Sequence, residues 1–286
     1  MAIYLDYNAT TPIRDEVKQS MLEVMGPPLN SSSVHSYGRK AKSYLQNARN
    51  SVANLINANN DQIVFTSGGT EANSMIMQSS KRPLISSVEH DAVMASSSNS
   101  EFIEVNSDGV VNLDKLEEKI NSTNPDMISV MWANNETGVI QPINEIVEIA
   151  KKFKIHVHCD AVQAVGKIKI DFKSSGLNSM AISSHKIGGP VGVGALVLSD
   201  PFKINPIIFG GGQERGHRSG TENLIGIVGF GSASDLVSRD SELINNIRFK
   251  QKQFEGLLKE NLSGIKIFGD NVERLPNTTC IYMPHL

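Results

Sequence analysis

Apolar and polar positions follow two alternating patterns between residues 63 and 198. Short apolar runs of strand length are separated by longer segments in which apolar residues recur at helical spacing, such as 113–120 and 143–153. The strand-like runs are 63–66, 84–87, 101–105, 127–131, 155–159, 180–182 and 193–198. This alternation is typical of βαβ units, so it predicts an α/β fold with a mostly parallel sheet and helices on both faces.

The same patterns predict further elements on either side of this region. They are a strand at 3–5, helices at 15–25, 34–56 and, as one long or broken helix, 222–262, and strands at 265–268 and 278–282. The segments after residue 240 are expected to belong to a second, smaller α+β unit.

Clusters of polar residues follow several of the predicted strands. In open α/β sheets, ligands bind outside the carboxyl ends of the strands. The sequence therefore predicts that these clusters meet at one edge of the sheet. Their central residues are Thr70, His90, Asn135, Asp160 and Lys186.

Lys186 lies between Ser183-Ser184-His185 and the glycine-rich turn that begins at Gly188. This is a suitable place for a reactive amine, at a strand end among hydroxyl groups and an imidazole. Taken alone, the pattern is also that of a solvated loop lysine. The other polar clusters favour the first interpretation.

Thr70 follows a strand and the pair Gly68-Gly69, and a helix begins beside it. Free N–H groups and the helix dipole favour a phosphate at such a position, although an ordinary helix cap has the same pattern. His90 also follows a strand, and its alternative interpretation is a capping or surface histidine.

Together these residues suit pyridoxal phosphate. Lys186 would form a Schiff base with the aldehyde, and Asp160 would pair with the protonated pyridine nitrogen. Gln163 and Asn135 would donate to the ring hydroxyl oxygen, and His90 would lie over the ring and transfer protons. The phosphate would be held by Gly69, Thr70, Ser183 and His185.

The order of the motifs resembles the class V aminotransferase family of fold-type I pyridoxal-phosphate enzymes, and within it the cysteine desulfurases of iron–sulfur cluster assembly. The matching segments are 4–12, 65–73, 89–90, 134–138, 160–163, 183–186 and 210–221. The resemblance implies conversion of L-cysteine to L-alanine with transfer of sulfur, and a homodimer in which Thr221 reaches the phosphate of the other subunit. It also implies a large domain at 12–240, a small one from 1–11 and 241–286, and an iron–sulfur scaffold or other sulfur acceptor as partner.

The sequence departs from this family at its end. The family uses a cysteine on a later mobile loop and a later arginine for the substrate carboxylate, and the sequence stops at Leu286 before either segment. The small domain is therefore expected to be incomplete. Cys159 and Cys280 are expected to be buried thiols. The alternative functions are a non-desulfurating relative, such as an aminotransferase or lyase, or an inactive dimerisation partner.

Composition narrows the remaining possibilities. The 286 residues carry a formal net charge of −3, which favours neither nucleic acid nor an anionic membrane as partner. We find no membrane span or signal peptide, and the two cysteines indicate no disulfide framework, so a cytoplasmic protein is expected.

Two other kinds of site have weak support. His156, His158 and Cys159 could supply metal ligands, but a strand points only the two histidines to one face, and no metal is expected. The run 226–231 is rich in glycine like a nucleotide-binding loop, but it lies inside a helical pattern.

Overall fold

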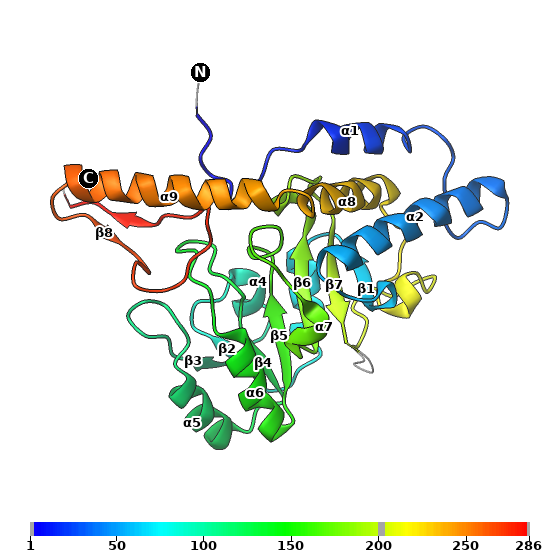
Figure 1. The fold of residues 1–286 in the computed structure, drawn as a ribbon. Coiled ribbons are helices and arrows are strands. Elements are labelled where there is room, and N and C mark those ends of the chain that lie inside the picture. Colours follow the sequence, from blue (N-terminus) through cyan, green and yellow to red (C-terminus); the bar gives the residue numbers. More distant parts are fainter. Residues whose placement is uncertain (1–2, 200–203, 285–286) are drawn as a thin grey trace.

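The computed structural model describes residues 3–199 and 204–284. Within these ranges a seven-stranded sheet forms the centre of the fold, and a separate two-stranded sheet lies near the C-terminal end (Figure 1). The strands are β1 (Ile63–Thr66), β2 (Pro83–Ser86), β3 (Glu101–Ile103), β4 (Met127–Ser129), β5 (His156–Asp160), β6 (Ser179–Ser183), β7 (Gly194–Leu198), β8 (Lys266–Ile267) and β9 (Ile281–Tyr282).

The large sheet has the order β1-β7-β6-β5-β4-β2-β3. β7 runs antiparallel to both of its neighbours, and the other pairs are parallel. A mostly parallel sheet, as the alternation predicts, is therefore present.

Helices cover both faces of this sheet. They are α1 (Asp15–Leu22), α2 (Ser36–Leu55), α3 (Gly69–Met77), α4 (Asp91–Met94), α5 (Leu113–Thr123), α6 (Ile143–Phe153), α7 (Phe172–Ser175), α8 (Leu224–Val237) and α9 (Ser241–Asn261). In β1, Ile63 and Phe65 pack into the core that α2, α5, α6 and α8 share, whereas Val64 packs into the core of α3 and α4. Both faces of the sheet are thus buried, which explains why its strands are continuous apolar runs.

The predicted strand at 3–5 is wrong, and the predicted strands at 265–268 and 278–282 are longer than the strands that form. Residues 3–5 form no strand, and Ile3 and Leu5 are exposed with 83% and 84% of their surfaces accessible. The pattern at 222–262 forms a broken helix, one of the two predicted forms, in which α8 is apolar and buried and α9 is largely exposed. Arg14 pairs with Asp240 at the break between them. β8 and β9 are only two residues long, shorter than the pattern predicts.

The glycine-rich run 226–231 lies inside α8 and serves close packing. A Cβ added at Gly231 would lie 2.6 Å from the Cα of Ala48 in α2, and one added at Gly229 would lie 2.9 Å from Met21 of α1. The run is therefore a helix contact, and the nucleotide-binding interpretation is wrong. The domain boundary predicted at residue 240 falls between α8 and α9 and stays a prediction.

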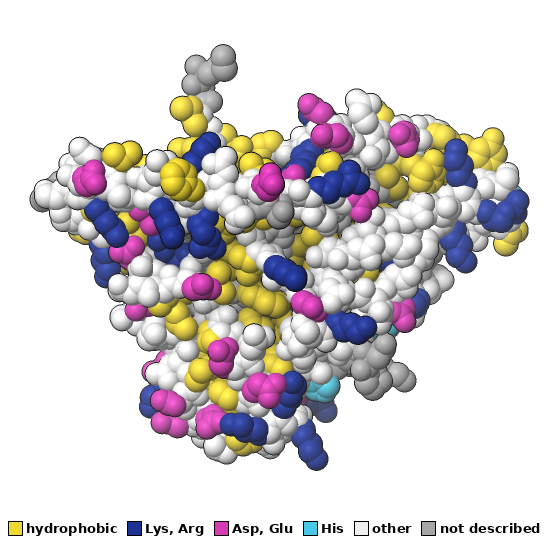
Figure 2. All heavy atoms as spheres, in the orientation of Figure 1, with side chains coloured by type: hydrophobic (Ala, Val, Ile, Leu, Met, Phe, Trp, Pro, Cys, Tyr) yellow, Lys and Arg dark blue, Asp and Glu magenta, His cyan; other side chains and the backbone are white. Residues whose placement is uncertain are grey.

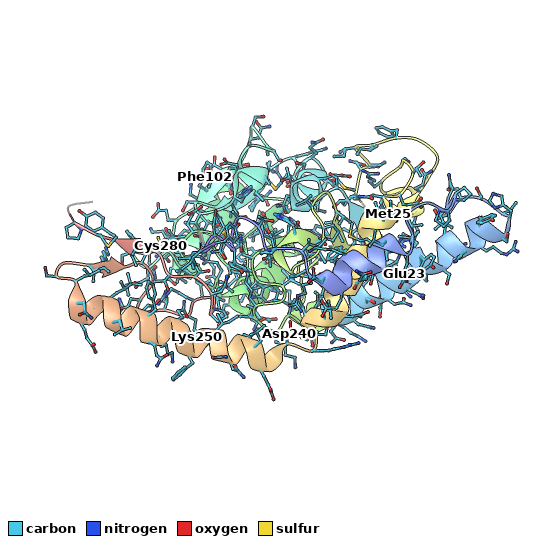
Figure 3. All side chains as sticks on the ribbon, turned by 90° about the horizontal axis from the view of Figure 1, so that it is seen from above. Glu23, Met25, Phe102, Asp240, Lys250 and Cys280 are labelled. Carbon is cyan, nitrogen blue, oxygen red and sulfur yellow. The ribbon has the colours of Figure 1, made fainter. Side chains whose placement is uncertain are left out.

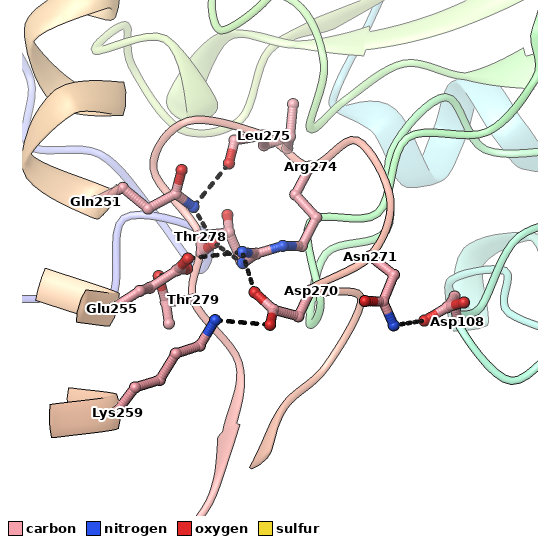
Figure 4. A network of polar contacts seen from close by, with 10 residues as sticks. All are labelled: Asp108, Gln251, Glu255, Lys259, Asp270, Asn271, Arg274, Leu275, Thr278 and Thr279. Carbon is pink, nitrogen blue, oxygen red and sulfur yellow. Dashed lines mark hydrogen bonds and ion pairs between the residues drawn. The ribbon is translucent and has the colours of Figure 1, made fainter. Parts of the chain in front are cut away.

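A network of polar contacts joins the segment 270–279 to α9 (Figure 4). Buried Arg274 pairs with Glu255 at 2.8 Å, and Thr279 donates to the same carboxylate at 2.8 Å. Leu275 N–H donates to the Gly138 carbonyl at 2.8 Å. The network thus fixes this segment between α9 and the loop that follows β4.

The surface carries both signs of charge. On the face shown in Figure 2, Lys and Arg are interspersed with Asp and Glu, in agreement with the small net charge. No helix within the described ranges has both the length and the apolar character needed to cross a membrane.

A buried ion pair holds the loop 209–221 against the sheet. Arg49 of α2 forms two hydrogen bonds of 2.7 Å with Glu214, and Phe65 N–H donates to the same carboxylate at 2.9 Å. The guanidinium also lies 4.7 Å from the centre of the Phe65 ring. Both charged groups are almost fully buried, so each charge is stable in the interior only because the other neutralises it.

Replacing Arg49 by Met should leave the Glu214 charge buried without its partner. We expect the free energy of unfolding to fall by about 3–5 kcal/mol, measured by urea denaturation of the cofactor-free protein at fixed concentration. Lys119→Met, which removes an exposed pair with Glu101, is the control and should cost less than ~1 kcal/mol. Equal losses in the two variants would contradict this role of the buried pair.

Candidate active site

One cavity of about 590 Å³ opens at the edge where the parallel strands end. Nine of the ten predicted site residues line it, and each comes from a strand end or from the segment just after one. They are Gly69, Thr70, His90, Asn135, Asp160, Gln163, Ser183, His185 and Lys186. The sequence pattern predicts that these residues lie at strand ends. They meet in one cavity because the strands that carry them run in the same direction.

Lys186 is the last residue of a 3₁₀ turn, Ser184–Lys186, that follows β6 directly. Its Nζ donates to the Asn8 carbonyl and, at 2.9 Å, to the Ala9 carbonyl. Thr11 holds the same turn through its N–H to the His185 carbonyl, at 2.9 Å. Burial lowers the pKa of Lys186, against the opposing charges of Asp160 and Asp6, which favours the free amine.

Asp160 ends β5 and is buried beneath the cavity. Its carboxylate accepts from Val162 N–H at 2.9 Å and from the Asn73 amide at 2.6 Å. Burial raises the pKa of Asp160, so its charged form depends on these donors and on a cation nearby.

A second layer of polar residues lies behind Asp160. His158 Nε2 lies 2.9 Å from Asn73 Oδ1, and its Nδ1 lies 2.8 Å from the Ser179 hydroxyl. Burial lowers the pKa of His158 to about 3, so the ring is neutral and orients the Asn73 amide toward Asp160. Sequence reasoning missed Asn73, although it lies three residues after Thr70 on the same helical face.

The metal interpretation of this strand has no support in the geometry. His158 is held by Asn73 and Ser179, and Cys159 points to the opposite face, into the apolar core. Within residues 3–199 and 204–284, no group of three or more His, Cys, Asp or Glu side chains is arranged to hold a metal ion.

His90 is both a helix cap and a cavity residue. Its Nδ1 accepts the Ala92 N–H at 3.0 Å at the start of α4, so the capping interpretation is correct. The neutral ring then carries its proton on Nε2. Because His90 also lines the cavity, that proton belongs to the same site as Lys186 and Asp160.

The start of α3 forms one end of the cavity. Gly69 and Thr70 begin this helix, whose first N–H groups have no partner within the helix. A Cβ added at Gly69 would lie 2.6 Å from Val162 Cγ2, so only glycine lets the backbone approach this closely. Ser183 and His185 line the same cavity.

Asn8 connects the site to distant parts of the chain. Its carbonyl accepts from Lys186 and, at 2.9 Å, from Gln163 Nε2. Its side chain donates to the Asn135 carbonyl at 3.0 Å and to the Thr278 hydroxyl at 2.9 Å. Sequence reasoning gave Asn8 no role. Its contacts with Lys186 and Gln163 are made by the main-chain carbonyl, which leaves no signal in the residue type.

Thr221 does not join this cavity within the chain. It lines a smaller cavity of about 100 Å³ together with Glu214 and Arg218. Arg218 pairs with Glu71 of α3 at 2.9 Å. The role of Thr221 in another subunit stays a prediction.

The residues of the large cavity fit pyridoxal phosphate. Lys186 supplies an amine, and Asp160 supplies a buried carboxylate that requires a cation. The free N–H groups at the start of α3 suit a phosphate, with Gly69 allowing its close approach.

Comparison with known proteins identifies the family. Residues 3–285 match the sequence pattern of the family Aminotransferase class-V. The chain belongs to the class V aminotransferase family. The "Cysteine desulfurase IscS" of Dictyoglomus turgidum is 38% identical over 96% of this chain and 74% of its own length. The "Cysteine desulfurase IscS" of Methanosarcina thermophila is 37% identical over 100% of this chain and 74% of its own length.

A solved structure has the same fold. The "NifS-like protein" from Rickettsia africae superimposes with a TM-score of 0.96 and 42% identity, over 100% of this chain and 82% of its own. The predicted family and fold class are therefore confirmed. Class V aminotransferases are pyridoxal-phosphate enzymes, so the predicted cofactor is confirmed as well.

Glu89, next to His90, is a buried acid that sequence reasoning left without a role. Its Oε1 accepts from Ser86 at 2.6 Å and from Met131 N–H at 2.6 Å, while its Oε2 is buried without a partner. Burial, and then the charge of Asp160, raises the pKa of Glu89 to about 8. The side chain is therefore protonated at neutral pH.

Glu89 should make the stability of the cofactor-free protein depend on pH. Between about pH 4.5 and about pH 8 the folded state keeps a proton that the unfolded chain loses. The free energy of unfolding should therefore fall as pH rises, by up to about 1.4 kcal/mol per pH unit. Urea denaturation across this range should show that the free energy of unfolding falls less with pH in Glu89→Gln than in the wild type. The exposed Glu145→Gln is the control and should show the wild-type fall. If Glu89→Gln retains the wild-type slope of unfolding free energy against pH, the assignment of this pH dependence to Glu89 is contradicted.

Proposed function

We propose that this protein is a pyridoxal-phosphate-dependent cysteine desulfurase, which converts L-cysteine to L-alanine and passes its sulfur to a thiol. The observation that carries this proposal is the meeting of Lys186, Asp160 and His90 in one cavity beside the free N–H groups of α3. The relatives named cysteine desulfurase, which match nearly the whole chain, support the substrate.

The bound cofactor supplies an aldehyde for amines and a ring that draws electrons from the substrate. Each chain residue then has a distinct task. Lys186 would supply the amine that holds the cofactor, and Asp160 would accept from the ring nitrogen, with its carboxylate kept in place by Asn73 and Val162. Gln163 and Asn135 would donate toward the ring oxygen.

His90 is positioned to move a proton. Its Nδ1 is occupied by the Ala92 N–H, so it gives and takes the proton at Nε2. Thr70, Ser183 and His185 line the same cavity and would hold the phosphate. These roles follow from placement in the cavity and from the family resemblance.

Neither cysteine is placed to attack the substrate sulfur. Cys159 is fully buried in the apolar core, and burial raises its pKa well above the usual range. Cys280 lies beside β8 and β9 (Figure 3), does not line the cavity, and has a pKa raised by burial and by Glu136. This observation favours a second candidate, a pyridoxal-phosphate enzyme that binds L-cysteine without sulfur transfer to its own thiols.

Three finer features belong to the same proposal. The protein acts as a homodimer in which Thr221 completes the phosphate site of the other subunit. It delivers sulfur to an iron–sulfur scaffold or another acceptor protein, and it works in the cytoplasm. The family resemblance supports all three.

Lys186→Ala should abolish covalent attachment of the cofactor. We expect borohydride treatment of the loaded wild-type protein to fix one pyridoxyl group on Lys186, detected by peptide mass spectrometry. Lys169→Ala, which removes an exposed lysine of the same region, should be labelled like the wild type. A wild-type protein labelled elsewhere, or not at all, would reject the proposed site.

The reaction itself is tested by the products formed from L-cysteine. With dithiothreitol as external sulfur acceptor, a desulfurase should release alanine and sulfide in equal amounts, whereas a lyase would give pyruvate. Cys159→Ser and Cys280→Ser should keep this activity, because neither thiol reaches the cavity. Loss of turnover in either variant would show that this cysteine is the nucleophile, and absence of alanine would reject the desulfurase.

A further inference from the structure

A second lysine lies beside the cavity, four residues after Gln163. The Nζ of Lys167 donates to Gln163 Oε1 at 2.6 Å and to Asn8 Oδ1 at 3.2 Å. Both acceptors are neutral amides, and the ion pairs found within residues 3–199 and 204–284 include no carboxylate on Lys167. A half-buried ammonium on neutral partners needs an explanation, because part of the desolvation cost remains without an opposite charge.

Lys167 determines which end of the Gln163 amide faces it. An ammonium has three donors and no acceptor, so only the amide oxygen can lie against it. Gln163 is buried, with 5% of its surface accessible, and its Nε2 donates to the Asn8 carbonyl at 2.9 Å. A flipped amide would set donor against donor at Lys167 and acceptor against acceptor at Asn8.

The same contacts connect Lys167 to Lys186. Asn8 accepts from Lys186 on its main-chain oxygen and from Lys167 on its side-chain oxygen, so one residue contacts both amino groups. Burial, and then the charge of Lys186, lowers the pKa of Lys167 to about 7, so the ammonium form of Lys167 predominates below that pH. The two lysines therefore repel each other across Asn8.

We propose that Lys167 is a positioning residue, whose ammonium fixes the Gln163 amide so that it offers a donor, not an acceptor, to the ring oxygen of the cofactor. The proposal rests on the function proposed above, which places Gln163 at that oxygen. A donor stabilises the negative charge that this oxygen carries, whereas an amide oxygen at the same place would repel it.

A double-mutant cycle tests this role, with Lys167→Met, Gln163→Met and the double variant. Two readouts other than activity are used: the dissociation constant for pyridoxal phosphate, and the pH midpoint of the visible absorption of the loaded protein. Lys167→Met should weaken binding about tenfold and raise the midpoint, because the ring oxygen loses a donor. In the Gln163→Met background the same change should alter binding less than about twofold.

Other variants separate positioning from general damage. Lys167→Arg keeps donors and charge and should restore both readouts, and Lys167→Gln keeps a donor without charge and should restore part of the binding. Lys169→Met is the matched surface control and should behave as wild type. If Lys167→Met does not fold, the remaining variants carry the test. The affinity for pyridoxal phosphate should then be similar in the wild type and Lys167→Arg and lower in Lys167→Gln.

The outcomes distinguish the two proposals. Equal effects of Lys167→Met in both backgrounds would overturn the positioning role and leave only a contribution to folding. A Lys167→Met protein indistinguishable from Lys169→Met would overturn it as well. Failure of the wild type to take up pyridoxal phosphate at Lys186 would reject the proposed function itself.

Discussion

The site depends on one constraint, the shared direction of β1, β2, β4, β5 and β6. Because these strands run the same way, their carboxyl ends meet at one edge. The centre of the sheet is buried on both faces, so polar side chains gather at this edge. Asp160 shows the constraint at its strongest, since it is the last residue of a central strand and is buried there. Its carboxylate needs the donors from Asn73 and Val162, and these in turn fix α3 and the start of the next segment.

Much of this arrangement can be predicted from the sequence. The alternation of strand and helix patterns fixes the fold class, and the position of a polar cluster after each strand predicts which residues converge. Lys186, Asp160 and His90 are found this way because each lies at the end of a strand or within four residues after it. Element ends are less well predicted, as residues 3–5 and the short β8 and β9 show. Strand patterns there do not reveal whether a partner strand is within reach.

Contacts made by the backbone, or between residues far apart in sequence, could not be predicted. Asn8 acts on Lys186 and Gln163 through a carbonyl oxygen that every residue possesses. The link from His158 through Asn73 to Asp160 joins a strand to a helix 85 residues away in the chain. The Arg49–Glu214 pair spans 165 residues. Charges on an apolar helix face or in a glycine-rich loop look like surface residues until the tertiary structure buries them.

Asn8 has a wider consequence. Its carbonyl binds Lys186, and its side chain binds Thr278 in the segment that the Arg274 network fixes to α9. The Lys186 amine and the segment 274–279 therefore share Asn8 as their common contact. Thermodynamic linkage then runs both ways. If a partner that shifts the segment 274–279 alters cofactor affinity through Asn8, occupancy of the cofactor site must alter the affinity for that partner by the same factor.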